Sequence, residues 1–150
     1  MGAEIIQVDV IIPTQTKYLE LIGHLGEQIV QKIDTFAADK DTLAYHLNLV
    51  LTEATTNAIK HGHHSNPQDT VKIAIHIQND ALNIKVYDHG PGFDLKTVLS
   101  PDLDNPKENG MGLFFIRSLM DKVTYTQTDD GNVLEIVKYL RPSCEQRNGS

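Results

Sequence analysis

The chain has 150 residues, 40% of them hydrophobic and 22% charged, which is typical of one globular domain rather than of a disordered or low-complexity protein. It carries 13 basic and 20 acidic residues, a formal net charge of −7, which disfavours direct binding to nucleic acid because such proteins rely on clustered Lys and Arg. Cys144 is the only cysteine, so we expect no internal disulfide. The first residues lack the features of a signal peptide, and no segment approaches transmembrane length. We therefore expect a cytoplasmic protein without membrane segments.

The chain opens with one predicted strand and one predicted helix. Residues 4–12 are rich in Ile and Val and stop at Pro13, which suits a strand. Apolar residues then recur every three or four positions between Leu19 and Phe36, the spacing of one buried stripe on a helix. Thr14 or Thr16 is expected to cap this helix.

A second predicted helix follows and ends near His61. Asp39 or Asp41 can cap its start, and the glycine and polar residues after His61 break it. The side expected to face the core carries Leu43, Leu47, Val50, Ala54 and Ala58.

The second half of the chain predicts two hairpins around a third helix. Apolar and polar residues alternate in the strands, which is typical of sheets with one buried face. The long segment between the first hairpin and the helix is rich in Gly, Pro, Asp and Asn and is expected to be a functional loop. The expected ranges are strands 71–77 and 82–86, loop 88–112, helix 113–121, and strands 123–128 and 133–140.

This order of elements predicts an α+β fold, a two-layer α/β sandwich. Three helices are expected on one face of a mixed, mostly antiparallel sheet. We expect one domain over residues 1–142 and a flexible tail over 143–150.

Glu53 and Asn57 lie four residues apart in the second predicted helix, so both fall on one side of it, with Lys60 close by. At the rim of a pocket, an amide oxygen can ligate a hard cation such as Mg²⁺, and a carboxylate can orient or deprotonate a hydroxyl. Taken alone, the ordinary interpretation is a polar pair on a solvated helix face.

A second motif, Asp88-x-Gly90-x-Gly92, ends the first hairpin. Glycines permit positive φ and close approach of a flat ligand, and the carboxylate can accept a hydrogen bond from an amino group such as that of adenine. A simple Gly-Pro turn is the alternative.

A third motif, Gly110-x-Gly112, opens the third helix. The free amides and the dipole at a helix start form an anion site, although a loop-to-helix junction has the same pattern. The chain has neither a Walker P-loop motif nor a Rossmann glycine motif after its first strand, which excludes those two classes of nucleotide-binding protein.

Together the three motifs are more specific than any one of them. Their order resembles the N, G1 and G2 boxes of the Bergerat-fold ATP-binding superfamily, which includes gyrase, histidine kinases and MutL. The resemblance covers about residues 5–140. The small size, the missing phosphoacceptor-histidine helix and the short loop between Gly92 and Gly110 look most like the anti-sigma-factor serine kinases.

The resemblance implies ATP and Mg²⁺ as ligands and a role for each of the first two motifs. Asn57 would hold Mg²⁺ against the triphosphate, and Glu53 would be the general base for an incoming serine hydroxyl. Asp88 would bind the adenine amino group, with Gly90 and Gly92 shaping the base pocket.

The third motif would contact the phosphates. Residues 93–109 would form a lid, and Lys60 and Lys107 are candidates for additional positive charge. Asn132 stands where the family often has Thr, and its amide could replace the hydroxyl that supports the adenine contact. The backbone amides expected to cradle the phosphates are those around Gly110, Met111, Gly112 and Leu113.

The leading hypothesis is an ATP-dependent serine-protein kinase and anti-sigma factor. It would phosphorylate a STAS-type anti-anti-sigma partner and otherwise sequester a sigma factor, and the family leaves a homodimer open. The alternative is a nucleotide-gated binding module that transfers no phosphate. A third hypothesis, the catalytic domain of a sensor kinase, is disfavoured because no dimerisation and phosphoacceptor helix precedes it.

Overall fold

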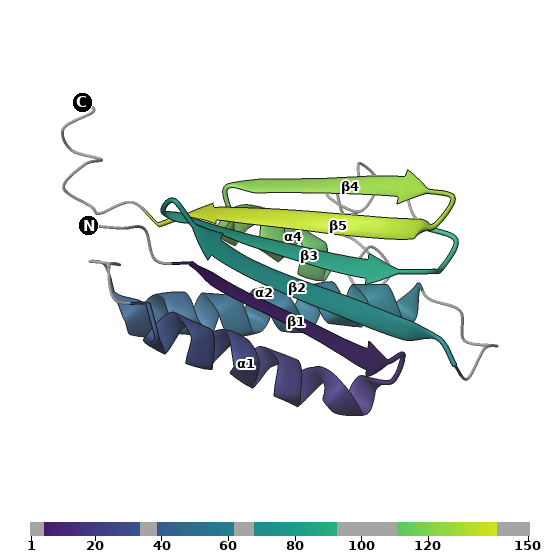
Figure 1. The fold of residues 1–150 in the computed structure, drawn as a ribbon, viewed down its shortest axis with the longest axis horizontal. Helices are drawn as coiled ribbons and strands as arrows, with labels where there is room; N and C mark the ends of the chain where they lie inside the picture. Colours follow the sequence, from purple (N-terminus) through teal and green to yellow (C-terminus); the bar gives the residue numbers. More distant parts are fainter. Residues whose placement is uncertain (1–4, 34–38, 62–67, 93–110, 141–150) are drawn as a thin grey trace.

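The structure is a computed structural model and describes residues 5–33, 39–61, 68–92 and 111–140. The predicted lid, with Lys107 and Gly110, and the predicted tail lie outside the described residues. In chain order the elements in Figure 1 are β1 (Ile6–Pro13), the 3-10 turn η1 (Thr16–Tyr18), α1 (Leu19–Gln31), α2 (Lys40–Lys60), β2 (Thr70–Gln78), β3 (Ala81–Asp88), α4 (Met111–Leu119), β4 (Lys122–Thr128) and β5 (Gly131–Tyr139).

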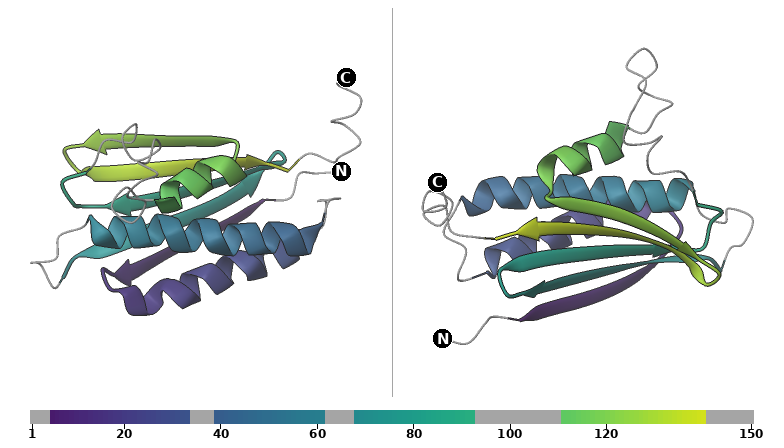
Figure 2. Two further views of the ribbon diagram at one scale, coloured as in Figure 1. Left: turned by 180° about the vertical axis from the view of Figure 1, so that it is seen from behind. Right: turned by 90° about the horizontal axis from the view of Figure 1, so that it is seen from above.

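The described strands form one sheet in the order β1-β2-β3-β5-β4, and each neighbouring pair is antiparallel. The sheet was expected to be mixed, so this detail of the prediction is wrong for the described strands. Figure 2 shows α1, α2 and α4 on the same face of the sheet, and none of the described helices lies on the other face. The two-layer α+β architecture is therefore as predicted. None of the helices in the described ranges combines the length and the apolar character that crossing a bilayer requires.

Register places apolar side chains in rows beneath the helices. Ile75 pairs with Ile84, which pairs with Ile136, which in turn pairs with Val123. All four are buried. Because burying one such side chain stabilises a fold by roughly 1.5–3 kcal/mol, rows of this kind fix the order and register of the strands.

Two glycines bring α1 close to α2. A Cβ added at Gly23 would lie 2.6 Å from Asn48 Oδ1, and one added at Gly26 would lie 2.5 Å from Leu51 Cδ1. Both distances are too short for real atoms, so the absence of side chains lets α1 press against α2. The residues of α2 that were expected to face the core are all buried.

Asp39 caps α2, as expected. Its carboxylate accepts hydrogen bonds from the backbone N–H groups of Asp41 (2.9 Å) and Thr42 (3.2 Å). A hydrogen bond from the Thr42 hydroxyl (2.7 Å) is the largest cause that lowers the pKa of Asp39, because it favours the charged carboxylate.

The expected cap of the first helix is wrong. The residue that precedes α1 is Tyr18, which makes no side-chain cap, and η1 intervenes between β1 and α1. Thr14 instead donates its hydroxyl to Asp69 Oδ2 at 3.0 Å, because Asp69 lies beside the end of β1. The helix also ends at Gln31, before the predicted limit at Phe36, which is outside the described residues.

Candidate functional site

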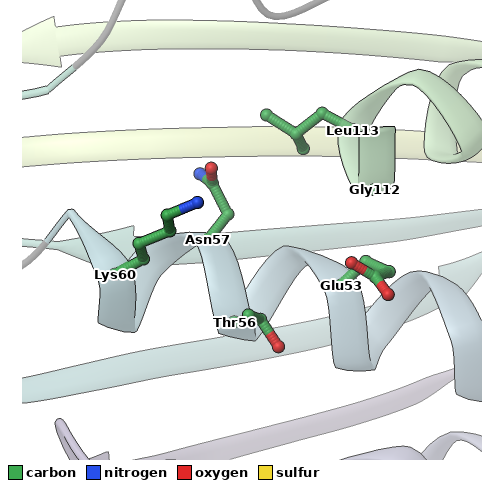
Figure 3. A pocket seen from close by; sticks show the side chains of 6 residues that line it. All are labelled: Glu53, Thr56, Asn57, Lys60, Gly112 and Leu113. Carbon is green, nitrogen blue, oxygen red and sulfur yellow. The ribbon is translucent and has the colours of Figure 1, made fainter. Parts of the chain in front are cut away.

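A small cavity of about 60 Å³ lies where α2 meets the start of α4. It has room for a few water-sized groups. The first and third motifs therefore meet in space, although they are far apart in the sequence (Figure 3). The residues that line the cavity are Glu53, Thr56, Asn57, Lys60, Gly112 and Leu113.

Glu53 and Gly112 are in direct contact. A Cβ added at Gly112 would collide with Oε2 of the Glu53 carboxylate. A side chain at position 112 would therefore have to displace the Glu53 carboxylate from its present place. The sequence had suggested only that this glycine opens the helix start to an anion.

Asn57 and Lys60 extend from α2 toward the start of α4, whereas the side chain of Thr56 points away from it (Figure 3). Both Asn57 and Glu53 are partly buried, so their oxygens line a semi-enclosed space. Within the described ranges, no group of three or more His, Cys, Asp or Glu side chains could hold a metal ion. The amide oxygen of Asn57 and the nearby carboxylate nevertheless suit Mg²⁺, which commonly takes one or two protein ligands and completes its shell with phosphate oxygens and water.

Asp88 ends β3 on the face of the sheet that carries the helices and is 4% exposed. Its Oδ1 accepts hydrogen bonds from the Gly90 N–H (2.9 Å) and from Asn132 Nδ2 (2.9 Å). Asp88 and Asn132 are directly opposite each other in the register of β3 and β5. The amide at position 132 therefore contacts Asp88, and both of these hydrogen bonds from described residues go to Oδ1.

The glycine loop after β3 is held by the hairpin of β4 and β5. Asn132 Nδ2 donates to the Gly90 carbonyl (2.8 Å), and Gln127 Nε2 donates to the Pro91 carbonyl (3.2 Å). Gly92 has φ +86°, and a Cβ there would collide with the side chain of Gln127. Position 92 thus requires glycine both for its left-handed backbone and for its close approach to β4.

Sequence reasoning did not find Gln127. An ordinary polar residue on an edge strand carries no signal of its own, and its role depends on a contact with a loop far away in the sequence.

A second hollow of about 180 Å³ lies at the end of β3. It is lined by Tyr87, Asp88, His89, Thr128, Asp130, Gly131, Asn132 and Val133.

His61 directly follows α2, and its pKa is lowered. Burial is the largest cause of this lowering, and the positive charge of Lys60 lowers the pKa further. The Asp88 carboxylate opposes both by raising this pKa. The second motif is placed by packing, because Asp88 ends β3 and β3 packs against α2.

The structure thus groups most of the predicted site residues. Glu53, Asn57 and Lys60 share a cavity with Gly112 and Leu113, and Asp88 ends β3, which packs against the same helix. Met111 begins α4, but its side chain is not described.

Known proteins resemble this chain in sequence. The histidine kinase-like ATPase domain family matches residues 13–138. The chain is 34% identical over 110 aligned positions to the serine-protein kinase RsbW of Staphylococcus epidermidis, and the match covers 67% of this chain and 69% of that protein. It is 27% identical over 151 aligned positions to the serine-protein kinase RsbW of Staphylococcus aureus strain JH9, and the match covers 95% of this chain and 92% of that protein.

A solved structure shares the fold. The histidine kinase domain from the Erythrobacter litoralis EL346 blue-light activated histidine kinase matches with a TM-score of 0.54 at 22% identity. The match covers 86% of this chain and 62% of that one, so the chain spans less than two thirds of that protein. The chain therefore belongs to the histidine kinase-like ATPase domain family, and its resemblance to the serine kinases of this family is confirmed.

Proposed function

We propose that this protein is an ATP-dependent serine-protein kinase that also acts as an anti-sigma factor. The observation that carries the proposal is the contact between Glu53 and Gly112, which puts a carboxylate beside the helix start expected to hold phosphate. Membership of the ATPase family and similarity to the serine-protein kinases RsbW support it.

The base of the nucleotide would lie against the second motif. ATP, bound with Mg²⁺, would supply the phosphoryl group. Asp88 Oδ2 would accept a hydrogen bond from the adenine amino group, because Oδ1 is already engaged by Gly90 and Asn132. Gly90 and Gly92 would let the base approach the backbone closely.

The phosphates would lie between α2 and α4. Asn57 Oδ1 would ligate Mg²⁺, and the amides around Gly110, Met111, Gly112 and Leu113 would donate to phosphate oxygens. Free N–H groups at a helix start and the helix dipole both favour an anion there. Lys60, on the rim of the cavity, and Lys107 would add positive charge.

Glu53 would be the general base. Its carboxylate would take the proton from the hydroxyl of a serine on the partner protein, which makes the oxygen a better nucleophile. Packing against Gly112 fixes this carboxylate, and fixed geometry matters because misplacement by about 1 Å can cost about 100-fold in rate.

The partner would be a STAS-type anti-anti-sigma protein in the cytoplasm. Phosphorylation of that partner would release the kinase, which would then sequester its sigma factor. We assign these functions to residues 1–142. The serine-protein kinase name of the relatives supports the transfer step, and the choice of partners is our extension from it.

The test is transfer of labelled phosphate from ATP to a purified STAS-type partner in the presence of Mg²⁺. We expect label on a partner serine with wild type and none with Glu53→Ala, while Glu53→Ala keeps much of its ATP affinity. Asp88→Asn should weaken ATP binding itself. A wild type that binds ATP but never labels the partner would instead indicate a nucleotide-gated binding module.

A further inference from the structure

His89, the residue between Asp88 and Gly90, contacts a buried carboxylate. Its Nδ1 lies 3.2 Å from Asp69 Oδ1, which is hydrogen-bonding distance. The side chain of His89 is 52% exposed, whereas that of Asp69 is 4% exposed. The contact therefore joins a half-exposed imidazole to a carboxylate that is held inside the protein.

Asp69 is fixed to the sheet rather than to the loop. The Thr14 hydroxyl donates to Asp69 Oδ2 (3.0 Å), and the Thr14 N–H donates to the Asp69 carbonyl (3.2 Å). Thr14 directly follows β1 and Asp69 directly precedes β2, so the carboxylate is anchored between two paired strands. Contact with it ties the His89 side chain to this rigid frame.

The opposite side of the loop is held by the β4–β5 hairpin through Asn132 and Gln127. Gly131 lies directly beneath the loop, since a Cβ there would be 2.6 Å from the Asp88 carbonyl oxygen and 3.4 Å from His89 Cδ2. Hydrogen bonds therefore hold the loop on both sides. The contact on the side of β1 and β2 is the one between His89 and Asp69.

We propose that His89 is a positioning residue of the base pocket, whose pairing with Asp69 holds the Asp88–Gly90 backbone so that Asp88 can receive the adenine amino group. This inference rests on the proposed function and deepens it. Loss of this hydrogen bond is therefore expected to weaken binding of the base.

Other charged groups lie close to this pair. Asp88 is the preceding residue, and Asp130 of the β4–β5 turn lines the same hollow as His89. At the end of α2, the charges of Lys60 and Asp88 both act on His61. These neighbours remain unchanged when position 89 alone is varied, so a change in base affinity reports on the His89 side chain.

The experiment is calorimetric titration of the full chain with adenosine. Adenosine has no phosphate and needs no Mg²⁺, so it reports on the base pocket alone. His89→Asn keeps a donor close to the place of Nδ1, and His89→Ala removes the donor. We expect His89→Asn to match wild type and His89→Ala to bind about tenfold more weakly.

Asp69→Asn and the double variant Asp69→Asn/His89→Ala complete the design, because His89→Ala alone leaves a buried carboxylate that can impair folding. If the pair acts as proposed, the double variant binds no more weakly than the worse single variant. Equal affinity of wild type and His89→Ala, or a loss in His89→Asn as large as that in His89→Ala, overturns the role of His89 while leaving the proposed function intact. A wild type that binds neither adenosine nor ATP overturns both.

Discussion

The carboxylate of Glu53 lies against the α-carbon of Gly112, in the space that a Cβ at position 112 would occupy. Glu53 belongs to α2 and Gly112 to the first turn of α4, so this contact joins two motifs that the chain keeps far apart. The proposed general base is thus positioned by the same helix start that is proposed to hold the phosphates.

Gly112→Ala is expected to impair phosphate transfer more than nucleotide binding. The added methyl group displaces the Glu53 carboxylate, and a displacement of about 1 Å is expected to lower the transfer rate roughly 100-fold. Transfer of labelled phosphate to the partner measures the rate, and adenosine titration measures the base pocket, where we expect a change of about twofold at most.

Ser118→Ala is the matched control for that variant. Ser118 is exposed on α4 and donates its hydroxyl to the Phe114 carbonyl of the same helix. It should transfer phosphate like wild type. If Gly112→Ala retained full transfer activity, Glu53 would not depend on this glycine for its position.

Asn132→Ala is expected to weaken adenine binding by about 1–3 kcal/mol, because it leaves buried hydrogen-bonding partners of the amide unsatisfied. The amide of Asn132 supports both Asp88 Oδ1 and the Gly90 carbonyl. Asn132→Thr should recover part of the loss, since a hydroxyl can still donate to Asp88. Adenosine affinity in the three proteins checks this order, and equal affinities would show that Asp88 needs no support from β5.

Much of the fold follows from local pattern. Strict alternation from Val71 to Ile77 predicts a strand with one buried face, and each of its alternate apolar residues is buried beneath the helices. The acidic residue at Asp39 predicts the start of α2 because its carboxylate reaches the amides of the next turn. These features depend on neighbours within a few residues, which is the range over which a sequence pattern is informative.

Contacts between distant segments were not predictable in the same way. The hydroxyl of Thr14 was expected to cap a helix but bonds with Asp69, because pairing of β1 with β2 brings the two residues together. The contact of Gln127 with Pro91 likewise depends on strand order. β5 lies between β3 and β4, and this order sets how near Gln127 of β4 comes to the loop after β3. The motifs reveal which chemistry is present, whereas strand order and register determine which residues support it.

Asn57→Ala is expected to remove the effect of Mg²⁺ on ATP binding. In wild type we expect ATP to bind more tightly with Mg²⁺ than with a chelator, and in the variant the two affinities should become equal. Adenosine binding, which needs no cation, should stay within about twofold of wild type. Asn83→Ala is the matched control, because its amide contacts Glu135 on the face of the sheet opposite the described helices. Retention of the Mg²⁺ effect in Asn57→Ala would assign the cation to another ligand.

His61 is expected to make the fold less stable at low pH. Burial, with the charge of Lys60, lowers its pKa below the ordinary value of 6.5, so the unfolded chain takes up a proton more readily than the folded chain. At pH 8 both states are neutral and the difference disappears. As the pH falls through 6.5 and toward the lowered folded pKa, proton uptake increasingly favours unfolding. His61→Gln cannot titrate, so the urea midpoint of wild type should fall relative to that of the variant between pH 8 and pH 5. A parallel decline of both midpoints would show that the protonation of this imidazole is not linked to folding.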